Sequence, residues 1–119
     1  MADDASNADR HSVSFHEATV VNFCRKGLSI ELQLDGVTSV RGKHGATVVL
    51  ETVTGLVVDG RSQSALTMEA EDAEVLTLEL NESGMLLILE WNDWGPRRQF
   101  VRTYVVQANA VRVAITPEG

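Results

Sequence analysis

The chain has a single cysteine, Cys24, among its 119 residues. One cysteine forms no disulfide within the chain, so we expect a fold that is stable in a reducing cytosol. We expect Cys24 to be a small buried strand residue rather than a reactive thiol. The sequence also lacks His-x-His, His-Glu-x-x-His and Cys-x-x-Cys spacings. Their absence argues against a dedicated metal site.

Long hydrophobic runs are absent as well. The longest run, Met85 to Leu89, is far too short to cross a bilayer. Residues 1–12 lack the basic start and the apolar stretch of a signal peptide. These two absences predict a cytoplasmic protein that does not bind membranes.

Proline is scarce, with two residues, whereas 44% of the residues are hydrophobic. A chain of 119 residues with this composition is long enough to bury one core without metals or disulfides. Residues 1–12, "MADDASNADRHS", are small and polar without periodicity, which is typical of a disordered arm. The sequence therefore predicts a disordered N-terminal arm over 1–12 and one all-β domain over 13–116.

No lysine or arginine occurs between Arg61 and Arg97, and the net charge of the chain is −7. The acids of this interval are Glu69, Glu71, Asp72, Glu74, Glu79, Glu82, Glu90 and Asp93. An acidic protein repels phosphate backbones, so nucleic acid is excluded as a partner and a basic protein is favoured. The alternative is that these acids only keep solvated strand faces and turns in solution.

Motifs of enzyme chemistry are missing too. There is no Gly-x-Ser-x-Gly, no lysine-based nucleophile motif and no glycine-rich phosphate loop. His16 and Glu17 are adjacent, so on a strand their side chains point to opposite faces and cannot act on one atom. We predict no enzyme, no catalytic residue and no cofactor; the alternative is an enzyme that assembles distant carboxylates in a cleft.

Alternation of apolar and polar residues dominates the chain from residue 13 onward, as in "LSIELQLDG" and "EVLTLELNESG". This period of two predicts half-buried antiparallel strands. Turn signals such as Asp35-Gly36, Thr54-Gly55, Asp59-Gly60 and Asn109 lie close together, which favours a meander over parallel strands with crossover helices. Strands are predicted at 13–24, 28–35, 46–53, 56–59, 65–70, 74–80, 85–92, 99–107 and 110–115. Segment 65–74 also suits a short helix, and 36–45 is predicted to be a loop.

The segment 85–91 is apolar on both faces, because Met85, Leu87, Leu89 and Trp91 share one parity and Leu86 and Ile88 share the other. A strand covered on both sides belongs in the centre of the fold. The fold class is therefore all-β, an antiparallel meander of eight or nine short strands that forms a strongly curled sheet, a sandwich or an open barrel. "EATVV" aligns with "DAEVL", and "GLSIELQLD" aligns with "GMLLILEWN", so the two halves are predicted to be similar.

Both tryptophans fall in "EWNDWGPRRQF". Trp91 continues the parity of the buried residues and is predicted to be in the core. Trp94 lies in a connection bent by Gly95-Pro96, where it is either exposed or folded back as a lid. The candidate partner-binding residues are Trp94, Asp93, Arg97, Arg98, Glu69, Glu71, Glu74 and Glu82.

The order "FHEATVV", "GLSIELQL", "TVVLETVTGLVVDG", "EDAEVLTLEL", "GMLLILEW" and "VRTYVVQANAVRV" resembles a diffuse group of short bacterial proteins. Its members open with a Phe-His-Asp-Ala strand, where this chain has Glu17 in place of the aspartate. Some members are similar to immunity proteins of polymorphic toxin systems. The resemblance implies a bacterial binding protein and carries over no catalytic residue.

Together these patterns favour a small acidic binding module, of the immunity type, for a basic protein partner. The alternative function is a β-barrel or sandwich that holds a small apolar ligand, with Trp91 lining the interior. A homodimer through an exposed sheet edge is a further hypothesis, because open sheets leave unpaired strand edges.

Overall fold

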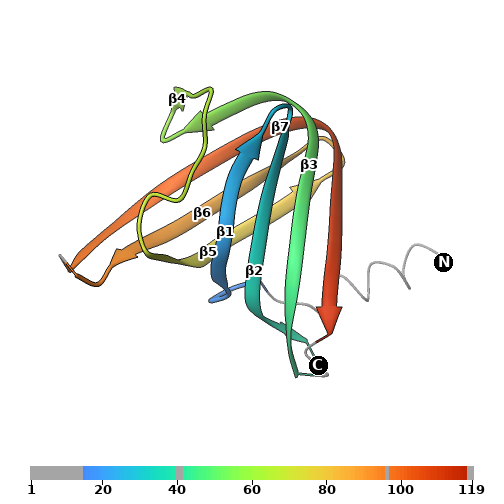
Figure 1. Cartoon of the computed structure of the whole chain (residues 1–119). Helices are drawn as coiled ribbons and strands as arrows, with labels where there is room; N and C mark the ends of the chain where they lie inside the picture. Colours follow the sequence, from blue (N-terminus) through green and yellow to red (C-terminus); the bar gives the residue numbers. More distant parts are fainter. Residues whose placement is uncertain (1–14, 40–41, 96, 118–119) are drawn as a thin grey trace.

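A computed structural model describes residues 15–39, 42–95 and 97–117. All regular structure in these ranges is strand (Figure 1): β1 (Thr19–Lys26), β2 (Ser29–Ser39), β3 (Gly42–Val58), β4 (Arg61–Ser62), β5 (Asp72–Asn81), β6 (Gly84–Asp93) and β7 (Arg98–Pro117). The prediction of an all-β antiparallel fold is confirmed. The arm predicted over 1–12 lies outside the described residues. None of the described residues belongs to a helix that could span a membrane.

The seven strands form one curled sheet with the order β2-β1-β5-β6-β7-β3-β4, and β2 also pairs with β3. The sheet therefore closes on itself in a ring-like way. Two meanders, β1–β2–β3 and β5–β6–β7, make up the sheet (Figure 1). The long strands β3 and β7 bend and run side by side from one meander into the other, whereas β1 and β5 share only the pair Thr19–Glu74.

The core fills the inside of this curled sheet, since alternate residues of each strand point inward. Trp91, Tyr104 and Phe23 are the largest fully buried side chains. The rings of Phe23 and Tyr104 meet edge to face at 5.0 Å between centroids, a favourable aromatic geometry. The indole N–H of Trp91 donates to the hydroxyl of Tyr104 at 2.9 Å, so its burial leaves no unsatisfied donor. The predicted core position of Trp91 is confirmed.

Several predicted turns are bulges inside longer strands, and for this reason there are seven strands rather than eight or nine. Gly36 has a φ of 72° and the β2–β3 register shifts beside it, so β2 continues to Ser39; β3 begins at Gly42, and the described part of the predicted loop 36–45 is strand. A second register shift lies between Val53 and Gly55, and β3 joins the segments predicted at 46–53 and 56–59. β7 likewise passes through Asn109. A bulge bends a strand without ending its pairing. The Asp59–Gly60 turn is confirmed, with positive φ at both residues.

Two other predicted segments differ. The first strand begins at Thr19 rather than at 13, because residues 16–17 form a turn in which Glu17 has a φ of 66°. Residues 63–71, which we name the crossing segment, are neither the predicted strand nor a helix. This segment runs beside β1, and the carbonyl of Leu66 accepts a hydrogen bond from the N–H of Arg25 at 3.1 Å. Leu66 is buried, so the crossing segment is anchored by packing as well.

Candidate functional site

The outer face of β5, β6 and β7 is the surface that combines exposed apolar groups with uncompensated charge. Residues that pair directly on neighbouring antiparallel strands lie on the same face. The rows across the three strands are Glu74–Glu90–Val101, Thr77–Ile88–Thr103 and Glu79–Leu86–Val105. Leu87, Leu89 and Trp91 alternate with these residues on β6 and are buried. The rows therefore point away from the core.

An apolar stripe runs over β6 and β7 on this face, formed by Leu86, Ile88, Val101 and Val105. Val101 is 49% exposed and Val105 is 41% exposed, while Leu86 and Ile88 are half-buried. The prediction that β6 is covered on both faces is therefore wrong. β6 does lie between β5 and β7 in the sheet, but no second layer of the described residues lies over this side. Exposed apolar groups that adjoin one another are typical of interaction sites.

Carboxylates border the stripe. Asp72, Glu74 and Glu79 lie on β5, and Glu90 lies on β6. None of these four forms an ion pair within the described ranges. Glu74 and Glu90 are directly opposite each other, an arrangement that destabilises a sheet. Local conflicts of this kind are expected where a surface serves a function other than stability.

The hairpin tip between β6 and β7 adds the exposed tryptophan. Trp94 is 60% exposed, so the alternative in which it folds back as a lid is wrong. Asp93 pairs with Arg98 at 2.5 Å and accepts the backbone N–H of Glu71 at 3.1 Å. These two hydrogen bonds lower the pKa of Asp93, and the one from Arg98 has the larger effect. The backbone beside Trp94 is thereby fixed, and the indole is left accessible.

Arg97 is exposed on this tip with a φ of 56°. The structure thus brings Trp94, Asp93, Arg97, Arg98 and Glu71 together, as the candidate list requires. Glu82, by contrast, lies in the turn between β5 and β6, at the opposite end of that hairpin. Glu74 belongs to the outer face.

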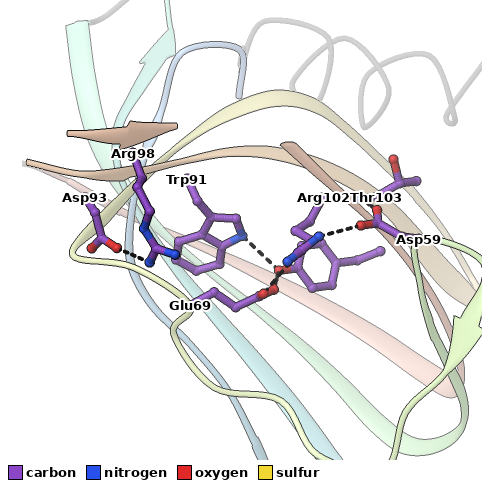
Figure 2. A network of polar contacts seen from close by, with 8 residues as sticks. Asp59, Glu69, Trp91, Asp93, Arg98, Arg102 and Thr103 are labelled. Carbon is purple, nitrogen blue, oxygen red and sulfur yellow. Dashed lines mark hydrogen bonds and ion pairs between the residues drawn. The ribbon is translucent and has the colours of Figure 1, made fainter. Parts of the chain in front are cut away.

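Glu69 has a structural role instead (Figure 2). Its carboxylate accepts hydrogen bonds from the hydroxyl of Tyr104 and from Nε of Arg102, the latter at 3.1 Å. Arg102 also pairs with Asp59 at 3.0 Å, and Asp59 accepts the N–H of Thr103 at 2.8 Å. Both carboxylates raise the pKa of Arg102, and the Thr103 hydrogen bond, assisted by Arg102, lowers the pKa of Asp59. This network joins the crossing segment and the β3–β4 turn to β7, and Glu69 is paired within the chain rather than placed on the outer face.

A pocket of about 580 Å³ lies between the β3–β4 turn and the crossing segment. Its walls mix charged, polar and apolar residues: Val58, Asp59, Arg61, Gln63, Ala65, Leu66, Thr67, Glu69 and Arg102. Trp91 is fully buried and does not line the pocket. The pocket therefore does not provide the apolar, Trp91-lined interior that the small-ligand alternative needs.

The sequence pattern missed the apolar stripe. Leu86 and Ile88 share a parity in the sequence, but this pattern predicts an interior position because an apolar strand face is usually covered. Val101 and Val105 share a parity with each other, and only the register with β6 shows that they lie beside Leu86 and Ile88.

The described residues contain no group of three or more His, Cys, Asp and Glu side chains arranged to hold a metal ion. His16 is exposed, and its Nδ1 donates to the carbonyl of Leu76 at 3.1 Å, as expected for a histidine beside the start of a strand.

Comparison with known proteins identified no matching family model, no similar curated protein and no similar solved structure. The functional argument therefore rests on the geometry of the chain itself.

Proposed function

We propose that the protein is a binding module whose outer face on β5, β6 and β7 receives a basic protein partner. One observation carries the proposal: the exposed apolar stripe of Leu86, Ile88, Val101 and Val105 is bordered by carboxylates that have no cation of their own within the described ranges.

The apolar stripe and the carboxylates that border it contribute differently to binding. Burying apolar side chains releases about 25 cal/mol for each Å² removed from water, so the stripe supplies affinity. Rim carboxylates act over a longer range, accelerating encounter with a positively charged surface and disfavouring acidic proteins and nucleic acid. Trp94 at the hairpin tip extends the contact, since tryptophan is among the residues that most often dominate binding energy.

An immunity-type role in the bacterial cytoplasm is the finer form of this proposal. Its support is the sequence resemblance together with the acidic face. A toxin that acts on nucleic acid carries a basic substrate site, and an acidic face of this kind would cover that site by charge complementarity.

Immobilised variants of the chain test the proposal by retention of proteins from the source organism. We expect a basic protein to be retained by the wild-type chain and lost on the double variant Glu74→Lys/Glu90→Lys and on Val105→Lys. Reversing two rim charges should slow association about tenfold or more and reduce its salt dependence. Trp94→Ala should weaken retention without lowering the melting temperature, because the indole is already mostly in water.

Matched controls are available on the other meander. Glu31→Lys reverses one charge on β2, and Leu28→Lys replaces a side chain that is 64% exposed in the β1–β2 turn. Both should retain the same protein as the wild-type chain. If all variants retain an identical set of proteins, or if the wild-type chain retains none, the outer face is not a binding surface.

A further inference from the structure

The second half of β7 has an unpaired edge. Residues 98–107 of this strand pair with β6, and residues 104–117 pair with β3. Because β6 begins at Gly84 opposite Gln107, no described strand lies beside residues 109–117 on the side away from β3. This exposed edge is longer than an average strand of about 5–6 residues.

The free edge also lacks the usual protection. Proteins blunt exposed edges with lysines, prolines, bulges or charges that project from the edge. The β3–β7 register is unbroken from Val53–Ala108 to His44–Pro117 apart from a single unpaired position, and proline occurs only at the last residue of the strand. The one charged side chain, Arg112, is drawn back over β3 by an ion pair with Glu51 at 2.7 Å.

The direction of the free backbone groups follows from one hydrogen bond. The N–H of Ala108 donates to the carbonyl of Ser83 at 2.9 Å, on the β6 side of the strand. Residues of a strand whose side chains share a face direct their backbone groups to the same edge, and beyond the unpaired Asn109 the residues on the core side are Val111, Val113 and Ile115. Their backbone groups therefore point away from β3, like those of the buried Ala108. Within the described ranges these groups have no partner on that side.

We propose that this edge pairs with the same edge of a second copy of the chain, in antiparallel register centred on Val113. With that centre, Val113 exchanges backbone hydrogen bonds with Val113 of the second copy, and Arg112 faces Ala114 of the second copy in a non-hydrogen-bonded pair. A centre on Arg112 would instead place two guanidinium groups opposite each other, which is unfavourable.

Side-chain burial favours the same register. Val113 is 44% exposed and Ile115 is 40% exposed. Both pair with buried residues of β3, Val48 and Ala46, so they lie on the core side of the sheet and extend its apolar layer. Centring on Val113 places Val111 opposite Ile115 of the second copy and covers this layer from both chains. The interface is separate from the outer face of β5, β6 and β7, and it goes beyond the proposed function.

Disulfide trapping tests the register. In a Cys24→Ser background, Val113→Cys should give a disulfide-linked dimer under mild oxidation. Hydrogen-bonded pairs have Cα atoms about 5.5 Å apart, within the range of a disulfide. Ala114→Cys is the matched control: it faces Arg112 of the second copy and should stay monomeric on a denaturing gel. Cross-linking at 114 and not at 113 would overturn the proposed register.

Light scattering tests the assembly itself. At about 100 µM, where a micromolar contact is largely formed, the wild-type chain should have twice its mass of 13.0 kDa. Val113→Pro removes an N–H that points away from β3, so the strand keeps its hydrogen bonds to β3. This variant should self-associate at least about tenfold more weakly, with an unchanged circular dichroism spectrum. A monomeric wild-type chain, or a Val113→Pro variant that is folded and still dimeric, would overturn the proposal.

Discussion

At the scale of single residues, Tyr104 connects the core to the crossing segment (Figure 2). Its hydroxyl accepts the indole N–H of Trp91 and donates to the carboxylate of Glu69. Burial raises the pKa of Tyr104 far above its ordinary value of 10.0, and the hydrogen bond to Glu69 raises it further. The phenol is therefore kept in its neutral, donating form.

Because Tyr104 is the only tyrosine, an alkaline titration reads this one group. The folded state holds its proton above pH 10.0 while the unfolded state releases it, so the free energy of unfolding should fall as pH rises above 10. Ultraviolet absorbance of the phenolate should appear only together with loss of the near-ultraviolet circular dichroism signal. Tyr104→Phe is the control, since it removes this alkaline loss. A phenolate that forms near pH 10 in a folded chain would contradict the described network.

At the scale of elements, local sequence predicts strand type well and strand ends poorly. The alternation in β2 and β6 identifies the inward residues, and Ile30, Leu32, Leu87 and Leu89 are all fully buried. In β5 the register shift between Val75 and Thr77 interrupts the alternation. A glycine or asparagine, however, serves a bulge as well as a turn. Gly36 and Asn109 both lie inside strands because the long-range β2–β3 and β3–β7 pairings continue past them. Local residues carry no signal of such pairing.

The close contact between Gly84, at the start of β6, and the backbone of β7 tests how the β5–β6 hairpin packs on β7. A Cβ added to Gly84 would lie less than 3.0 Å from the backbone carbonyl oxygen of Val106 on β7. We expect Gly84→Ala to reduce the free energy of unfolding by about 1–3 kcal/mol, since backbone must move to relieve the overlap. In Gly95→Ala the added atom has its nearest contact at 3.7 Å, with a side-chain oxygen of Glu71, so its effect should be small. Denaturant unfolding measures both, and equal midpoints would contradict the close packing of this hairpin on β7.

At the scale of the whole molecule, the two meanders correspond to each other as the sequence alignment predicts. β1–β2–β3 matches β5–β6–β7 in order, and the counterparts β1 with β5 and β3 with β7 join the halves. Thr19 and Glu74, which the alignment superposes, are the residues that pair between β1 and β5. The two halves differ beside their first turns, where Leu28 is 64% exposed and its counterpart Met85 is buried.

The functional surface was less predictable than this architecture. The acids of β5 and β6 could be inferred from spacing alone, whereas the spacing left Trp94 either exposed or folded back as a lid. The place of Val101 and Val105 beside Leu86 and Ile88 depends on the β6–β7 register. The role of Glu69 depends on a contact with Tyr104 across 35 positions of the chain. Neither feature has a local sequence signal.

The most direct test of the central claim is side-chain accessibility in the complex with a retained basic protein. Hydroxyl-radical labelling, read by mass spectrometry, should fall at Val101 and Val105 when the complex forms and stay unchanged at Leu28, which is distant in the other meander. Unchanged labelling of both valines in a saturated complex would contradict the assignment of the outer face as the binding surface.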